Sequence, residues 1–306
     1  MGGRHELGQN FLVDRRVIDR VTELVGATDG PIVELGAGGG ALTRPLARLG
    51  RPLTAVELDP RRADALRREL GGGGGADRRD GGSHRAGPAG HSAPAHDPGR
   101  MPRSGADRRS TQREHAPPGS PNAPSPVRVV TADALSWRFP GTPHVIASNV
   151  PFHVTTAVLR RVLAEPAWTD AILLTQWEVA RRRCGVGGTS QLTVQWAPWF
   201  EFALDRRVPA RAFRPAPSVD GGLFTIRRRA EPLVPDRDRR AYQAYVAALF
   251  SGRGRGLAQV LSRAPHPLPN AKTWLARRGI PADALPARLT PADWSALWEA
   301  VRRTRQ

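Results

Sequence analysis

The chain has 306 residues, a formal net charge of +18 and a sequence pI of about 11.6. Its one cysteine, Cys184, excludes an internal disulfide and a cysteine-rich metal site, and the sequence lacks the run of about 18 apolar residues that a membrane span needs. The basic excess favours a nucleic-acid partner over an anionic membrane, although an arginine-rich chain with Lys272 as its single lysine is also typical of a GC-rich genome.

The first part of the chain predicts strands and helices in alternation. Apolar residues at helical spacing predict a helix over residues 13–25, which Asp14 is placed to cap. Asp59 and Pro60 are placed as the cap and the first residue of a later helix. Between these helices we expect a strand at 31–35, a glycine-rich turn, a helix through Leu46 and Leu49, and a strand at 53–56. This order is typical of a parallel sheet covered by helices.

Residues 71–126 interrupt this pattern. They begin with five glycines, are rich in Gly, Pro, Ser, Asp and Arg, and contain no Val, Ile, Leu, Phe, Tyr or Trp. Such a composition buries too little apolar area to offset the entropy of ordering, so a disordered insert is predicted. The insert carries eight arginines and five acidic residues, so the other 250 residues hold +15 of the net charge of +18.

After the insert the alternation resumes, and helices then follow. We expect strands at 127–130, 144–147 and 171–174, helices at 154–163 and 178–183, and β-type runs at 192–196, 200–208 and 222–226. Later apolar faces predict helices around 242–250, 257–261, 274 and 294–301. The sequence thus predicts an α/β domain over residues 1–230 and a small helical domain over 231–306. The 14 basic and 6 acidic residues of 229–306 give a net charge of +8, which suits nucleic-acid binding.

A glycine-rich turn follows the first predicted strand, with the sequence Glu34-Leu35-Gly36-Ala37-Gly38-Gly39-Gly40. Glycines allow the backbone to turn sharply and to approach a ligand closely, so Gly36 and Gly38 are predicted to bind a cofactor. Glu57 ends the second strand about 20 residues later, where a carboxylate can accept hydrogen bonds from both ribose hydroxyls. Nicotinamide and adenosylmethionine cofactors both offer these hydroxyls. Helix capping is the alternative role of Glu57.

Polar residues also stand at the ends of the third and fourth strands. Asp133 is placed to accept a hydrogen bond from an adenine amine, unless it is a surface acid without a ligand. The side-chain oxygen of Asn149 and the carbonyl of Val150 can hold the amine of a target adenine so that its lone pair points at a sulfonium methyl group. Pro151 restricts Val150 to extended geometry, and Phe152 offers a face on which an extruded base can stack. An ordinary turn is the alternative interpretation.

With these residues the chain resembles the ribosomal RNA adenine N6-methyltransferases, which include the erythromycin-resistance (Erm) enzymes and the KsgA-type small-subunit dimethyltransferases. The matching motifs are residues 9–12, 34–40, 149–152, 176–181 and 213–220. The resemblance implies a Rossmann-like class I methyltransferase sheet with a small C-terminal helical domain, and S-adenosylmethionine (SAM) as the cofactor. It implies cofactor contacts for Asn10, Leu12, Gly36, Glu57, Asp133 and Asn149.

The loop 151–156 and the arginine-rich composition resemble Erm proteins of actinomycetes. That resemblance implies methylation of one adenine in protein-free 23S rRNA, with resistance to macrolides, lincosamides and streptogramin B. Three alternatives stay open: KsgA-type dimethylation of 16S rRNA, a non-catalytic nucleic-acid-binding protein on the same fold, and a nicotinamide oxidoreductase, for which the sequence offers no plausible catalytic acid. We expect a cytoplasmic monomer that binds neither a metal nor a membrane.

Overall fold

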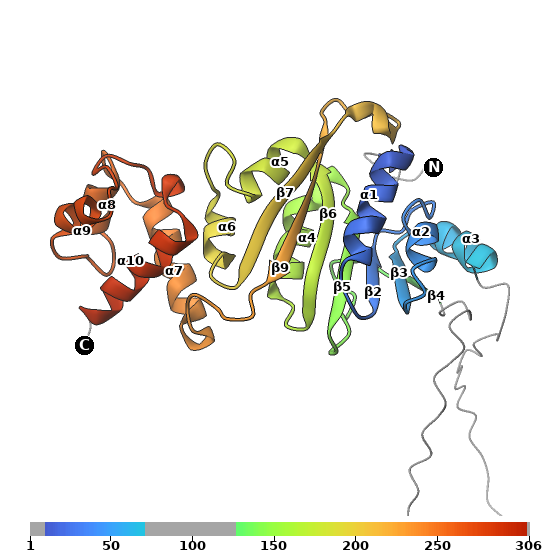
Figure 1. Cartoon of the computed structure of the whole chain (residues 1–306), viewed down its shortest axis with the longest axis horizontal. Coiled ribbons are helices and arrows are strands. Elements are labelled where there is room, and N and C mark those ends of the chain that lie inside the picture. The colour runs from blue at the N-terminus through green and yellow to red at the C-terminus, as the bar shows by residue number, and fades with distance from the viewer. Residues whose placement is uncertain (1–9, 71–126, 305–306) are drawn as a thin grey trace, which may run out of the picture. The chain divides into compact units, whose positions relative to one another are not determined.

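The computed structural model describes residues 10–70 and 127–304, all of which belong to one compact unit (Figure 1). The predicted disordered insert at 71–126 lies outside the described residues, as do residues 1–9 and 305–306. Among the described residues, no helix has both the length and the apolar character to cross a membrane. In the same part of the chain, His, Cys, Asp and Glu side chains do not gather into a group of three or more that could hold a metal ion.

A seven-stranded mixed sheet with the order β4-β3-β2-β5-β6-β9-β7 forms the centre of the fold. Its strands are β2 (Ile32–Leu35), β3 (Leu53–Glu57), β4 (Val127–Thr131), β5 (His144–Asn149), β6 (Trp168–Gln176), β7 (Phe200–Val208) and β9 (Gly221–Arg228). Strands β2 to β6 run parallel, whereas β9 is antiparallel to both β6 and β7. The predicted α/β fold with a parallel sheet is confirmed, and the apolar runs of β2 and β5 are buried on both faces, as parallel strands usually are.

Helices cover both faces of this sheet. They are α1 (Arg15–Gly26), α2 (Thr43–Ala47), α3 (Pro60–Leu70), α4 (Thr155–Ala164), α5 (Trp177–Arg183) and α6 (Gln191–Trp196). Val17, Val21 and Val25 of α1 form one apolar cluster with α2 and the facing strand residues. Helices α4, α5 and α6 contribute to a second cluster, which contains the strand residues of the other face.

The two predicted helix caps are confirmed. The side chain of Asp14 accepts hydrogen bonds from the backbone amides of Arg16 and Val17, at 2.9 and 3.3 Å. Asp59 accepts from the amide of Arg61 at 2.9 Å, directly before the first residue of α3. Each cap satisfies amides that lack a partner within the helix and stabilises it by about 1 kcal/mol.

The chain ends in helices α7 (Arg239–Ser251), α8 (Leu257–Ser262), α9 (Ala271–Arg277) and α10 (Pro291–Arg303), with 3-10 turns η3 (Asp236–Asp238) and η4 (Pro286–Arg288). They confirm the predicted C-terminal helices. The second apolar cluster continues from the sheet into this region without a break. Trp199 meets Tyr242 edge to face with ring centroids 5.7 Å apart, and the Tyr242 hydroxyl donates to the Val194 carbonyl at 3.0 Å. Helix α7 is therefore packed firmly against α6 and the turn that leads into β7.

The predicted β-type run at 192–196 is wrong, because this segment forms α6. Its apolar residues alternate as in a strand, but Ser190 starts a helix by accepting a hydrogen bond from the Thr193 amide at 3.2 Å. Contact of α6 with α7 then covers the helix. The helix predicted through Leu49 also ends earlier, at Ala47.

Candidate active site

The candidate site lies where the order of the parallel strands reverses. The chain passes from β2 outward to β3 and β4, and then returns to place β5 on the other side of β2. Segments that leave the carboxyl ends of β2 and β5 therefore turn away in opposite directions and leave a crevice, which is where open α/β sheets bind ligands. The glycine-rich turn, Glu57, Asp133 and Asn149 all line one cavity at this edge.

The glycine-rich turn leaves open space for a ligand. Gly36 has a φ of +74°, a conformation that favours glycine, and a Cβ added there would meet no atom within 4 Å. Gly40, at φ +80°, is required for packing instead, because its Cβ would lie 2.6 Å from Cδ2 of Leu66 on α3. The amides of Gly36 and Ala37 both donate to the Val56 carbonyl, at 2.8 and 3.1 Å, which ties the turn to β3.

Glu57 connects the end of β3 to this turn. Its side chain is 4% exposed, and its two carboxylate oxygens accept hydrogen bonds from the amides of Gly38 at 2.6 Å and Asp59 at 2.9 Å. Capping of α3 falls to Asp59 and not to Glu57. A carboxylate offers about four acceptor positions, so two remain for hydroxyl groups of a ligand in the cavity.

Glu34 is a site residue that the sequence reasoning placed only as the acid before the glycines. It is 1% exposed, lines the cavity, and its Oε2 has no hydrogen-bond partner among the described residues. Burial raises its pKa to about 8, and the nearby Glu57 carboxylate acts in the same direction. A buried acceptor without a partner fits a ligand that carries positive charge, and SAM brings both a sulfonium and an ammonium group.

Asp133 and the N-terminal residues complete the cofactor side. Asp133 is exposed and follows β4, and its Oδ1 accepts from the Leu135 amide at 2.9 Å. Asn10 and Leu12 line the cavity next to the short strand β1 (Phe11–Leu12). The structure thus brings together every residue that was predicted to contact the cofactor.

Asn149 ends β5 and is held by a contact that fixes its amide. Its Nδ2 donates to the carbonyl of Asn10 at 3.0 Å, so its Oδ1 is left as the acceptor. The Val150 amide donates to the Leu174 carbonyl at 2.9 Å, while the Val150 carbonyl has no hydrogen-bond partner within the described part of the chain. Asn149 lines the cavity, so its acceptor can reach an amine there, whereas Val150 is 1% exposed and does not line the cavity. The role of the Val150 carbonyl stays a prediction.

Phe152 occupies a different place from Asn149. It begins the 3-10 turn η1 (Phe152–Val154) and does not line the cavity, whereas Pro151 and His153 do. Its ring meets that of Phe213 edge to face, with centroids 6.3 Å apart and planes at 71°. Phe213 is fully buried in β8 (Phe213–Arg214), which pairs antiparallel with β1. Sequence reasoning quoted Phe213 only within a motif, because the signal for this contact is a long-range strand pair.

The fold and the site together define a class I SAM-dependent methyltransferase. The orphaned Oε2 of Glu34, the free acceptor positions of Glu57 and the open space at Gly36 fit SAM. When bound, SAM supplies an electrophilic methyl group on a positively charged sulfur.

Comparisons with known proteins identify the family. The family model described as ribosomal RNA adenine dimethylase matches residues 2–74 and 118–302, and the chain belongs to this family. It is 43% identical over 261 residues to an rRNA adenine N-6-methyltransferase of Corynebacterium diphtheriae, covering 85% of this chain and 83% of the relative. It is 40% identical over 303 residues to the mycinamicin-resistance protein MyrB of Micromonospora griseorubida, covering 99% and 80%.

A solved structure agrees with this assignment. The fold matches the crystal structure of the 23S rRNA methyltransferase ErmE with a TM-score of 0.71 and 30% identity, over 96% of this chain and 100% of that one. The chain is an rRNA adenine N6-methyltransferase, and SAM is its methyl donor. The resemblance drawn from the sequence is confirmed.

Proposed function

We propose that the chain methylates the N6 amine of one adenine in protein-free 23S rRNA and thereby confers resistance to macrolide, lincosamide and streptogramin B antibiotics. Two similarities support the choice of RNA, since one relative is named a mycinamicin-resistance protein and the matching crystal structure is of a 23S rRNA methyltransferase. An added methyl group on the target base would narrow the drug pocket of the ribosome. Such an enzyme acts where ribosomal RNA is made, in the cytoplasm.

The orientation of the Asn149 amide carries this proposal. The exocyclic nitrogen of adenine is a weak nucleophile because its lone pair is delocalised into the ring. Asn149 Oδ1 and the Val150 carbonyl accept the two amine hydrogens and turn the lone pair toward the methyl donor. No strong base is needed, because holding the amine in this geometry lowers the barrier by positioning and by electrostatics.

Phe152 supports the same chemistry from the RNA side. An adenine must leave its base stack to reach Asn149, and a flat aromatic face offsets part of the cost of unstacking. The edge contact with Phe213 restrains the ring of Phe152, so less side-chain entropy is lost when a base stacks on it. Thr155 ties this turn to β6, because its Oγ1 lies 3.2 Å from the Phe152 carbonyl and 2.7 Å from Thr175 Oγ1.

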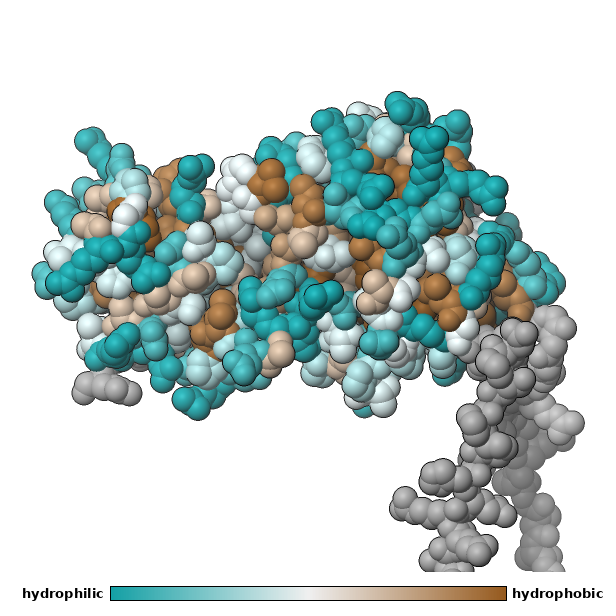
Figure 2. Space-filling view, viewed as in Figure 1, coloured by the Kyte–Doolittle hydropathy of each residue, from teal (hydrophilic) through white to brown (hydrophobic). Residues whose placement is uncertain are grey.

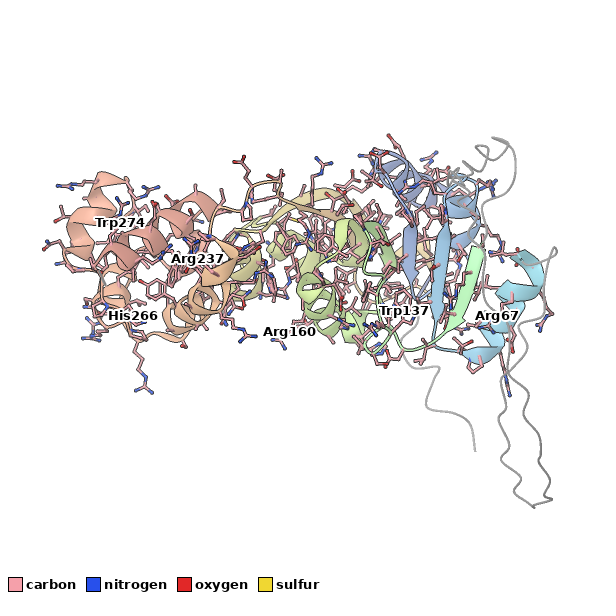
Figure 3. The ribbon with its side chains drawn as sticks, turned by 90° about the horizontal axis from the view of Figure 1, so that it is seen from below. Arg67, Trp137, Arg160, Arg237, His266 and Trp274 are labelled. Carbon is pink, nitrogen blue, oxygen red and sulfur yellow. The ribbon has the colours of Figure 1, made fainter. Side chains whose placement is uncertain are left out.

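A cluster of arginines on α4 and α5 supports a polyanionic substrate. Burial lowers the pKa of Arg183, and the positive charges of Arg182 and Arg160 act in the same direction. Arg160 and Arg182 are exposed and form no ion pair within the described residues. Arg160 projects outward from α4 (Figure 3). We propose that this surface contacts RNA phosphates.

We also propose that the C-terminal helices at 231–306 add nonspecific phosphate contacts. Hydrophilic side chains are spread over the face shown in Figure 2, with apolar residues only in small patches between them. Arg253 and Arg255 between α7 and α8, Arg263 after α8 and Arg277 of α9 are exposed and have no acidic partner in the described part of the chain. RNA binding should therefore weaken steeply as salt concentration rises.

The test is methylation of separate RNA substrates. Purified protein is incubated with labelled SAM and with bare 23S rRNA, bare 16S rRNA or intact 50S subunits, and the modified base is mapped by reverse-transcription arrest. We expect one modified adenine in bare 23S rRNA, and little incorporation in the other two substrates or with Asn149→Ala. Modification of 16S rRNA alone would favour the KsgA-type alternative. Binding of RNA without any incorporation would favour the non-catalytic one.

A further inference from the structure

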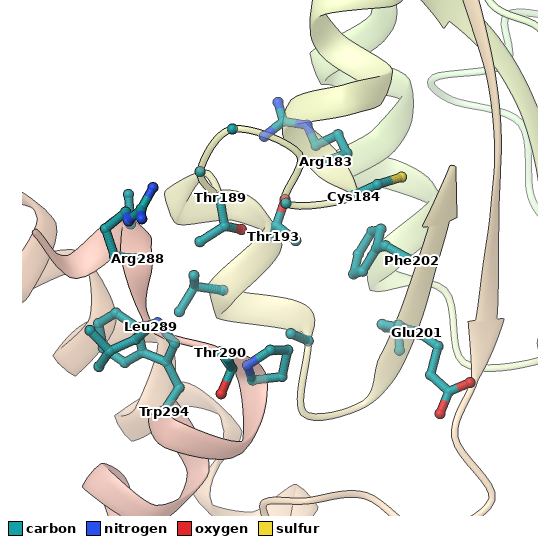
Figure 4. Close-up of a pocket in the computed structure, with 18 of the residues that line it drawn as sticks. Arg183, Cys184, Thr189, Thr193, Glu201, Phe202, Arg288, Leu289, Thr290 and Trp294 are labelled. Carbon is teal, nitrogen blue, oxygen red and sulfur yellow. The ribbon is translucent and has the colours of Figure 1, made fainter. Parts of the chain in front are cut away.

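A second cavity, of about 480 Å³, lies away from the methyl-transfer site (Figure 4). Its walls come from the α5–α6 connection, the start of β7, and the residues that lead from η4 into α10. None of the residues assigned to SAM or to the target amine lines it. Its volume is in the range of small-ligand sites, about 300–1,000 Å³.

Arg183 places a partly buried positive charge on this cavity. Its Nη1 donates to Ser190 Oγ, its Nε is buried without a partner, and no carboxylate pairs with it among the described residues. Removing a guanidinium from water without a counter-charge is unfavourable. An anion in the cavity would supply that counter-charge.

Arg288 of η4 brings a second arginine to the same cavity from the C-terminal helices. It is exposed and has no ion-pair partner within the described residues. The Thr189 amide donates to the Ala287 carbonyl at 3.0 Å, which holds the α5–α6 connection next to η4. Arg183 and Arg288 line the same side of the cavity as Thr189, and Phe202 lies across from Arg288 (Figure 4).

The charge on the cavity wall is positive overall. Its one carboxylate is that of Glu201, which is already paired with Arg229 at 2.6 Å. Arg183, Arg229 and Arg288 against Glu201 leave a net charge of +2 on the wall. The site therefore favours an anion.

The remaining wall is apolar and aromatic. Phe202 is partly exposed on β7, and Trp294 of α10 is 1% exposed, with an indole Nε1 that has no partner in the described residues. A ligand that suits both walls needs an anionic group and a flat ring with acceptor atoms. A nucleotide has both of these features.

We propose that this cavity binds one phosphate-bearing nucleotide, with its phosphate between Arg183 and Arg288 and its base against Phe202. The nucleotide is one of the substrate RNA, outside the target adenine, or a free nucleoside monophosphate. The assignment of this nucleotide to the substrate RNA rests on the proposed function. The position of the cavity, next to the arginine cluster of α4 and α5, favours RNA over a free nucleotide.

Two charge-removing variants and one matched control test the phosphate contacts. Arg288→Gln removes an exposed charge that makes no ion pair, so it should not disturb folding. Arg183→Gln removes the buried charge but keeps a donor for Ser190. Arg303→Gln is the matched control, since it changes net charge by the same amount at an arginine that is 74% exposed and already paired with Glu299.

Binding is measured for a labelled 23S rRNA fragment over a range of salt concentrations, and for AMP by calorimetry. Saturating S-adenosylhomocysteine is present in both assays, so that AMP cannot occupy the cofactor cavity. For an RNA nucleotide we expect Arg288→Gln and Arg183→Gln each to weaken RNA binding several-fold and to lower the slope of log K against log salt by about 0.7–0.9. Arg303→Gln should leave both values near those of the unaltered protein, and SAM affinity should not change.

AMP binding that Arg288→Gln abolishes, with RNA binding unchanged, would support the proposal with a free nucleotide as the ligand. Phe202→Leu should then weaken AMP binding but not binding of inorganic phosphate, because it removes the flat face alone. RNA and AMP affinities that match the Arg303→Gln control in both variants would overturn the proposal. Absence of 23S methylation in the unaltered protein would instead contradict the proposed function and leave the AMP measurement valid.

Discussion

The amide of Asn149 donates to the backbone carbonyl of Asn10 at 3.0 Å, across 139 residues of sequence. This bond decides which end of the Asn149 side chain faces the substrate amine. A donor Nδ2 turned toward the amine would repel it, whereas the acceptor Oδ1 binds it. The N-terminal segment that contributes to the cofactor cavity therefore also sets the polarity of the catalytic side chain.

Asn149→Ala should lower kcat by about 10²- to 10³-fold, because it removes an acceptor that acts as charge develops on the amine. Single-turnover methylation at saturating RNA and SAM measures this effect. Asn10→Ala is the matched control, since it leaves the backbone carbonyl in place. It should raise the Kd of SAM with a much smaller change in kcat, and an equal loss of kcat in both variants would contradict the assigned roles.

Phe152→Ala should weaken capture of the target base by about 1–3 kcal/mol, the usual contribution of a base stacked on an aromatic ring. SAM affinity should stay nearly unchanged, because Phe152 does not line the cofactor cavity. Phe213→Leu should act in the same direction and more weakly, since it removes the edge contact that restrains Phe152, and it should also lower stability because Phe213 is fully buried in the core. Fluorescence-based RNA binding and calorimetric SAM binding check this, and equal losses in both would count against stacking.

Glu57→Ala should raise the Kd of SAM and also destabilise the free protein. The amides of Gly38 and Asp59 lose their acceptor, and because both are only partly buried each costs less than the roughly 1–3 kcal/mol of a fully buried unpaired amide. Glu57→Gln keeps one acceptor oxygen. Its Kd for SAM and its free energy of unfolding should lie between those of Glu57→Ala and of the unaltered protein. Calorimetric titration and urea denaturation give the two values. A Kd for SAM that does not move in Glu57→Ala would remove this residue from the ribose site.

Glu34 should make the stability of the SAM-free protein depend on pH. Burial raises its pKa in the folded state from 4.5 to about 8, so the folded protein binds the proton that the unfolded chain releases. The contribution of protonated Glu34 to the free energy of unfolding is present in full below pH 4.5. It is lost as pH rises toward 8, by at most about 5 kcal/mol. Glu34→Gln should remove this part of the pH dependence and be more stable than the unaltered protein at pH 8.

Denaturation of both proteins at pH 5, 6.5 and 8 isolates this effect, because all other titrating groups are shared. A positively charged ligand favours the ionised carboxylate, so SAM affinity of the unaltered protein should increase with pH over the same window and that of Glu34→Gln should not. Parallel stability curves for the two proteins would show that Glu34 is ionised in the cavity at neutral pH.

The sequence alone determined the α/β fold and most of the cofactor site. Gly36, Glu57, Asp133 and Asn149 stand at or directly after the ends of strands that apolar runs and helix caps make recognisable. Parallel strands place all their carboxyl ends at one edge of a sheet, so residues at these ends must meet whatever the details of packing. The class of reaction followed from the residue types at that edge.

Only the tertiary structure decided the remaining features. Residues 192–196 alternate like a strand, yet contact with α7 and the Ser190 cap make them a helix. The Phe152–Phe213 and Asn149–Asn10 contacts depend on the pairing of β1 with β8, which joins segments about 200 residues apart. Local patterns record neither such pairing nor the loss of solvent around Glu34 and Arg183, because burial and long-range register arise only when distant segments pack together.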